Sequence, residues 1–203
     1  MEGLEICNLK CSIKADLFVT FEDLSHRCKT KSWFCQKYNS YIVIKPKESL
    51  RFIIFNSQLQ SQITHINLTG VRTFPLLESA LELLSNFLDI PQTYMRCSLD
   101  NISGKSEKIY SLIHESSVPK KTINLHNLLH HIAKTHQNES IKLRYSPDSF
   151  NALVLKHQST TLLVYHTGKV VVIAAKDLKR IADIIEKVFL SAKHVLHALE
   201  HSI

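Results

Sequence analysis

Hydrophobic and polar residues alternate along several stretches of this chain. Residues 4–14 place one set of side chains on each side of an extended backbone, which predicts a first strand. Thr20 followed by Asp23 resembles a helix N-cap, so a short helix is expected through about Cys28. Three further strands are expected in the first half: Tyr38–Ile44, Leu50–Asn56 and His65–Thr69. Pro46 cannot donate to a strand ladder, so 45–49 is expected to be a turn, and the polar residues 57–64 form a second connection.

Apolar residues at a period of 3.6 predict two long helices, each closing one half of the chain. The first begins near Phe74, with Pro75 in its first turn, and Pro91 ends it. The second covers Asp177–Glu200. Between them, the second half is expected to hold a shorter helix and four strands: Leu125–Lys134, Arg96–Gly104, Ser149–Lys156, Thr160–His166 and Lys169–Ala174. Short turns between strands require a largely antiparallel sheet, with one face covered by helices and the other open.

The same order occurs twice: a strand, a helix, a run of three antiparallel strands, and a helix. This predicts two repeats, residues 1–93 and 94–203, related by an approximate two-fold axis. Each repeat also carries a spaced pair of aromatic residues. Tyr38 and Phe55 are 17 positions apart, and Phe150 and Tyr165 are 15 apart. A ligand with its own two-fold symmetry could use such a matched placement.

The charge is uneven along the chain. The formal net charge is +7, and residues 94–203 hold 15 of the 25 Lys and Arg but only 9 of the 18 acids. A basic half suits a polyanion, although basic charge alone does not establish one. The five cysteines lack paired spacing, which favours free thiols in a reducing compartment and makes a structural zinc a minor alternative. No apolar run approaches the roughly 18 residues of a membrane span, and no signal peptide is expected.

Catalytic and metal chemistry find little support in the pattern. His126 and His130 share a helix face, and His194, His197 and His201 share another, but no carboxylate or thiol completes a metal set. Residues 103–106 lack the upstream glycine of a Walker motif. No nucleophile–base arrangement is visible. We therefore expect a binding protein with no catalytic residues, metal or cofactor.

The second half resembles the TATA-box-binding protein family. Residues 145–156 match the family's Tyr-x-Pro-x-x-Phe strand, and 160–171 match the following strand and its Ser-Gly-Lys turn. In the first half, Tyr38 and Phe55 keep the family's spacing, and Leu68-Thr69-Gly70-Val71-Arg72 matches its Thr-Gly-Ala-Lys segment. The resemblance covers nearly the whole chain, and it is closest in residues 141–190.

This resemblance implies an α+β saddle, in which two pseudo-symmetric repeats form one curved antiparallel sheet with helices on its convex face. The concave face would sit on the DNA minor groove. Four aromatic residues would wedge between base steps and bend the duplex: Tyr38, Phe55, Phe150 and Tyr165. Two of these are tyrosines where the family usually has phenylalanine.

The family's other groove contacts correspond to ten residues here: Asn8, Lys10, Ile53, Asn67, Thr69, Asn101, Ser103, Leu163, Val171 and Ile173. Lys10 and Ser103 stand where the family has valine, which makes the surface more polar than usual. Phosphate contacts, which position the protein without reading sequence, are expected from Lys37, Arg72, Lys156, Lys169 and Lys176. The second half, being closer to the family pattern and more basic, is expected to hold DNA more strongly.

By resemblance, the function would be transcription initiation on AT-rich promoter DNA, in the nucleus or at a viral transcription site. Partners would be a factor IIB-type protein and a multisubunit RNA polymerase. The loop Lys156–Thr160, which corresponds to the family's second stirrup, is shorter than its first-half counterpart. A protein–protein interaction module that has lost DNA binding is the main alternative. A nucleic-acid-binding piece of a repair or RNA-processing enzyme is a weaker one.

Overall fold

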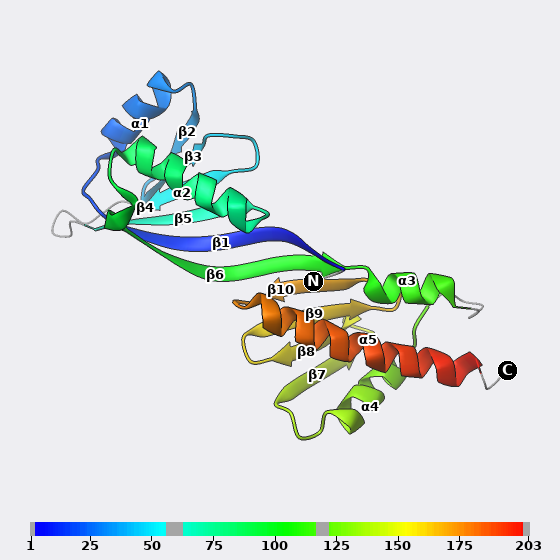
Figure 1. Ribbon diagram of the computed structural model, residues 1–203. Coiled ribbons are helices and arrows are strands. Elements are labelled where there is room, and N and C mark those ends of the chain that lie inside the picture. Colours follow the sequence, from blue (N-terminus) through cyan, green and yellow to red (C-terminus); the bar gives the residue numbers. More distant parts are fainter. Residues whose placement is uncertain (1–2, 56–62, 117–121, 201–203) are drawn as a thin grey trace. The chain divides into compact units, whose positions relative to one another are not determined.

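A computed structural model describes residues 3–55, 63–116 and 122–200 (Figure 1). The first elements along the chain are β1 (Leu4–Asp16), α1 (Phe21–Thr30), β2 (Phe34–Lys37), β3 (Tyr41–Lys45), β4 (Arg51–Phe55), β5 (Ile63–Val71) and α2 (Phe74–Leu88). After the short 3-10 helix Gln92–Tyr94 come β6 (Met95–Ser106), α3 (Lys108–Glu115), α4 (Leu125–Thr135), β7 (Ile141–Ser146), β8 (Phe150–His157), β9 (Thr160–Tyr165), β10 (Val170–Ala174) and α5 (Leu178–Glu200).

The described strands are hydrogen-bonded in the order β2-β3-β4-β5-β1-β6-β10-β9-β8-β7. From β2 to β1, and again from β6 to β7, successive strands are antiparallel. Each series pairs its first strand with its fifth, then the fourth, third and second. The α+β class and the antiparallel sheet predicted from the sequence are therefore confirmed.

Two compact units divide the chain, and each contains parts of β1 and β6. The first unit is Asn8–Asn101, and the second unit is Met1–Cys7 with Ile102–Ile203. These units come from contacts in space, so they do not test the repeat boundary between residues 93 and 94, which stays a prediction.

In each unit one face of the strands is covered and the other is open. The buried side chains of the first unit alternate along its strands: Leu9, Cys11, Ile13, Ile42, Ile44, Phe52, Ile54, Ile66 and Leu68. The second unit repeats the alternation with Leu153, Leu155, Leu162, Val164, Val170 and Val172. Helix α5 buries Ile181, Ile184 and Val188, and it packs against α3 and α4. We call the other side of the strands, where residues are half-buried or exposed, the open face.

Local sequence explains where the helices begin and end. Thr20 and Asp23 form a reciprocal capping box at the start of α1, as predicted. The Thr73 side chain accepts a hydrogen bond from the Leu76 backbone N–H, and Pro75 lies in the first turn of α2. Helix α2 ends at a left-handed residue, Asp89 (φ 59°), two positions before the proline expected to end it.

The structure corrects the predicted order of elements. Each unit has four strands after its first helical region, because β2 and β7 were not predicted. The strand expected at Tyr38–Ile44 begins only at Tyr41, and Tyr38 lies in the turn before it, where its N–H donates to the Tyr41 carbonyl. Helix α3 was also missed, so two helices lie between β6 and β7 where one lies between β1 and β2. Part of the predicted 57–64 connection lies outside the described residues.

Candidate nucleic-acid interface

The open face of the first unit is a ladder of half-buried side chains. Val43 on β3 pairs with Ile53 on β4, Ile53 pairs with Asn67 on β5, and Asn67 pairs with Ser12 on β1. Directly opposite residues in antiparallel strands have their side chains on the same face. The predicted groove residues Ile53 and Asn67 are thus neighbours. Thr69 lies two residues after Asn67 on β5, opposite Arg51.

Three aromatic rings meet at one end of this face. Tyr38 stacks on Tyr41 with ring centroids 4.6 Å apart and planes 22° apart. Tyr41 in turn lies 6.0 Å from Phe55, which it faces across the β3–β4 pair. Tyr38 is 39% exposed, so it is the outermost ring of the group. The predicted pair Tyr38 and Phe55 is therefore connected by a third aromatic, Tyr41, which sequence reasoning did not single out.

The second unit repeats this register with different side chains. Leu163 on β9 faces Val154 on β8 and Val171 on β10, as Ile53 faces Val43 and Asn67. Tyr165 faces Ala152, the position equivalent to Tyr41. Phe150 lies two residues before Ala152, on the same side of β8, and it is 44% exposed. The second aromatic pair therefore lacks a ring between its members.

A groove lies where the middle ring is missing. It has a volume of about 510 Å³, and it is lined by Phe150, Ala152, Val154, Ser146, Ser149, Leu143, Lys142, Arg144 and Lys156. Pairing places Lys142 opposite Lys156 and Arg144 opposite Val154, so the two β7 cations are on the open face. Within the described residues, these three cations make no ion pair. Lys142 and Arg144 were missed because β7 was missed, although its alternating sequence could have revealed it.

Polar side chains occupy the first unit's open face along β1. The Asn8 Oδ1 accepts a hydrogen bond of 2.7 Å from the Gly70 backbone N–H. The Ser12 hydroxyl donates to Asp100 Oδ2 over 2.5 Å and lies 3.3 Å from Asn67 Oδ1. Lys10 stands at an irregularity in the β1–β5 ladder, between Leu9 and Cys11. The Asp100 carboxylate thus lies beside Ser12, which in turn contacts the predicted groove residue Asn67.

The remaining predicted positions lie on other parts of the two units. On β6, Asn101 and Ser103 alternate with the buried Ile102. Ile173 on β10 is 45% exposed, on the same side as Val171. These placements describe the residues without testing their roles.

Two of the five predicted phosphate contacts are engaged with helices. Lys37 pairs with Glu22 of α1 (2.9 Å), and its ammonium lies 5.5 Å from the Phe21 ring. Its partner across the ladder is the buried Ile42, so Lys37 points to the covered side. Lys169 lies 5.8 Å from the ring of Tyr110 on α3. Arg72 and Lys176 are exposed just beyond β5 and β10, and only Lys156 lines the groove.

The histidines and cysteines of the described chain form no metal site. His131 stacks on His194 at 4.3 Å, but no group of three or more possible ligands occurs within the described residues. Burial and the neighbouring His194 lower the pKa of His131.

All five cysteines are free thiols. A hydrogen bond with the Cys97 thiol, together with burial, raises the pKa of Cys11 well above its usual range, so that thiol is a poor nucleophile. None of the described helices is long and apolar enough to cross a membrane.

Comparison with known proteins identifies the fold. A family model described as "Transcription factor TFIID (or TATA-binding protein, TBP)" matches residues 108–191, which include residues 141–190, where the sequence resemblance is closest. Among solved structures, the chain is similar to Methanococcus jannaschii TBP, with a TM-score of 0.62 and 17% sequence identity. That likeness covers 95% of this chain and 99% of the archaeal one. No curated protein sequence matches the chain.

The structural match spans both series of strands described above, and the family model lies within the second half of the chain. Proteins of this family are transcription factors that bind DNA and are not enzymes. The 17% identity shows that this fold is held by a very different sequence. Residues 108–191 therefore match the TATA-binding protein family, and the chain as a whole has the fold of a TBP.

Proposed function

We propose that this protein binds promoter DNA through the minor groove, using the open faces of its two units, and bends it by inserting aromatic side chains between base pairs. The observation that carries the proposal is the presence of exposed aromatics on both open faces. Phe150 and Tyr38 are 44% and 39% exposed, on strands or turns where a solvated surface would favour polar residues.

Insertion of these rings costs free energy, because base pairs must be unstacked, and contacts with the protein surface can offset this cost. Unstacking one base step costs a few kcal/mol, and the bent duplex then reaches more protein surface. The stack of Tyr38 on Tyr41 holds the outer ring before DNA arrives, so less conformational entropy is lost on binding. Phe150 has no such support from Ala152, but the cationic groove beside it offers phosphate contacts.

Polar groups between the wedges suit the minor groove of AT-rich DNA, which presents only acceptors at A·T pairs. The Gly70 N–H fixes the oxygen of the Asn8 amide, which orients its nitrogen as the donor. Ile53 and Leu163, at equivalent register positions, would make apolar contacts beside the wedges. Asn101, Ser103, Lys10, Asn67, Thr69, Val171 and Ile173 complete the proposed groove contacts.

The helices and the second-half loop would recruit the transcription machinery. By analogy with the family, a factor IIB-type protein would contact the loop between β8 and β9, and a multisubunit RNA polymerase would follow. The loop is tight, since Thr160 begins β9 only three residues after His157 ends β8. The site of action would be the nucleus or a viral transcription site.

One observation favours a second function, a protein-interaction module that has lost DNA binding. The Asp100 carboxylate accepts a hydrogen bond from Ser12, which also contacts Asn67, so a negative charge lies near the proposed groove contacts. Base-edge acceptors and phosphates would both repel it.

Bending of a doubly labelled AT-rich duplex, followed by energy transfer between its ends, distinguishes the two functions. We expect Phe150→Ala with Tyr165→Ala to abolish the bend while leaving part of the salt-sensitive binding. The matched control is Phe74→Ala with Tyr94→Ala, which removes one exposed phenylalanine and one exposed tyrosine from outside the open faces. A wild-type protein that binds without bending, or a Phe150/Tyr165 double variant that bends normally, would contradict the proposal.

A further inference from the structure

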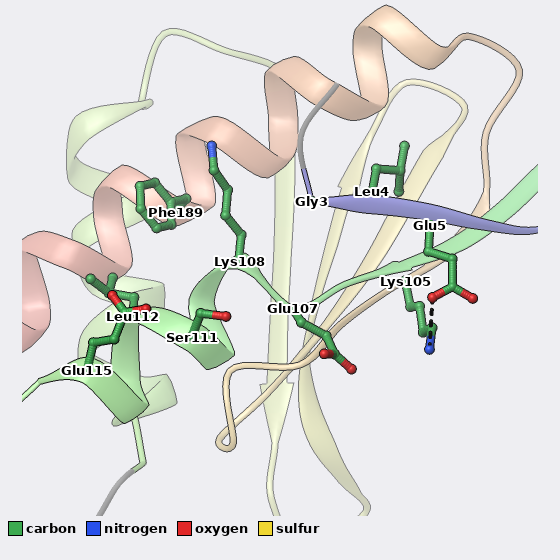
Figure 2. Close-up of a pocket in the computed structure, with 10 residues that line it drawn as sticks. All are labelled: Gly3, Leu4, Glu5, Lys105, Glu107, Lys108, Ser111, Leu112, Glu115 and Phe189. Atoms are coloured by element: carbon green, nitrogen blue, oxygen red, sulfur yellow. Dashed lines mark ion pairs between the residues drawn. The ribbon is translucent and has the colours of Figure 1, made fainter.

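A second cavity, of about 540 Å³, lies in the second unit where α3 and α5 meet the start of β1 and the end of β6 (Figure 2). Its lining residues are Gly3, Leu4, Glu5, Lys105, Glu107, Lys108, Ser111, Leu112, Glu115 and Phe189. Gly3, just before β1, lies next to α3: a Cβ at this position would be in ordinary contact with the Lys108 Cβ, at 3.6 Å. The proposed DNA contacts use none of these residues.

Three of the residues that line this cavity are apolar: Leu4, Leu112 and Phe189. Ile109 and Ile113 of α3 are fully buried, which fixes the helix against the second unit's core and α5. Ser111, Leu112 and Glu115 of the same helix then line the cavity. Figure 2 shows Leu112 near Phe189 of α5. Leu112 and Phe189 are only half-buried, so they offer apolar area to another molecule.

The charges around the cavity are not balanced. Lys105 is paired with Glu5 at 3.1 Å, and this contact raises the pKa of the lysine. Lys108 is paired with Glu186 and lies 4.6 Å from the Phe189 ring centroid. Lys105 and Lys108 are therefore both paired with carboxylates of the same unit.

Two carboxylates remain on the rim. Within the part of the chain that the structure describes, neither Glu107 nor Glu115 makes an ion pair. The rim is thus acidic, in a chain whose formal net charge is +7. An acidic rim repels nucleic acid and attracts cationic side chains.

We propose that this cavity is a docking groove for a short segment of a partner protein that carries an apolar side chain next to Lys or Arg. The apolar side chain packs on Leu112 and Phe189, and the cation pairs with Glu107 or Glu115. An apolar centre with a charged rim is the usual anatomy of a protein interface. The proposal of this docking groove rests on the proposed function in one respect: its partner would be another transcription protein.

Selection of a random peptide library on the full chain tests the groove directly. We expect the selected peptides to share an apolar residue flanked by Lys or Arg. Affinity of a synthetic consensus peptide, measured by fluorescence polarisation, should fall roughly two- to fivefold in Glu107→Gln with Glu115→Gln, because the rim ion pair is lost. Leu112→Ser should weaken it as well.

The matched control is Glu78→Gln with Glu82→Gln, which removes two exposed acids from α2. Selection of peptides without basic residues, or equal affinity of the rim and control variants for the consensus peptide, would overturn the proposal. The rim variant should bend DNA as the wild type does. Failure of the groove is therefore separable from failure of DNA binding, which the aromatic variants report.

Discussion

The cationic groove beside Phe150 makes a quantitative prediction about salt dependence. Lys142 and Arg144 are alternate, exposed residues of β7, both on the open face, and neither makes an ion pair within the described residues. Replacing both with glutamine removes two charges from a solvent-exposed strand edge. Such surface changes alter unfolding free energies by only about 0.5 kcal/mol, so the fold should persist.

The expected effect follows from counterion release. Each phosphate contact contributes about 0.9 to the slope of log affinity against log salt, so two lost contacts should reduce the slope by about 1.8. Between 50 and 200 mM salt, the wild type should therefore lose roughly tenfold more affinity for an AT-rich duplex than the double variant does. The bend should remain, because the aromatic residues are unchanged.

A control with the same net charge separates direct contact from general attraction. Lys179→Gln with Lys193→Gln removes two exposed lysines from α5, on the covered side of the second unit. Titration by fluorescence polarisation at several salt concentrations gives the slope for each protein. If the β7 variant and the α5 variant have the same slope, the groove does not hold phosphates and the reasoning is wrong.

Three further predictions concern stability and charge. Gly70→Ala should lower the free energy of unfolding by about 3 kcal/mol or more in urea denaturation, because φ is +85° and the new Cβ would lie 1.7 Å from the Ser49 carbonyl oxygen; a shift below 1 kcal/mol would contradict this. Asp100→Asn should tighten duplex binding roughly two- to fivefold by removing a negative charge near the groove contacts, and weaker binding would favour a structural role for the carboxylate. The pair with Lys187 lowers the pKa of Glu139, so its contribution to stability is present above the ordinary carboxyl pKa of about 4.3 and lost as pH falls through the lowered value. Urea midpoints measured across that range should therefore fall less in Glu139→Gln than in the wild type, and parallel curves would show that the pair contributes nothing.

The sequence by itself determined those elements whose signals are local. Thr20 caps α1 as predicted, because an N-cap satisfies backbone groups only three residues away. Helix α2 begins at Phe74, as expected from Pro75 in its first turn. The apolar stripe of α5 and the short β-branched, apolar runs of β9 and β10 also fixed their elements, because these patterns are local to each element. The antiparallel sheet followed from the short turns, and the family resemblance followed from the spacing of Tyr-x-Pro-x-x-Phe and Gly-Lys.

Only the tertiary structure decided how the candidate site is built. The sequence named Tyr38, Phe55, Phe150 and Tyr165, but the ring between the first two appeared only when β3 paired with β4 and placed Tyr41 opposite Phe55. Lys37 was expected at the nucleic acid, yet pairing with Ile42 turns it to α1.

The wrong placement of Lys37 and the failure to predict Lys142 and Arg144 both arise at the edge strands, β2 and β7. Phe34–Lys37 is only four residues long, and the face of each of its side chains is set by hydrogen bonds to β3 rather than by its own sequence. The same holds for Lys142 and Arg144, whose place on the open face depends on the register of β7 with β8. A period of two tells which residues share a face, but it does not tell which face is covered. That is decided by residues far away in the chain, the apolar side chains of the helices that bury one side of each unit and leave the other open.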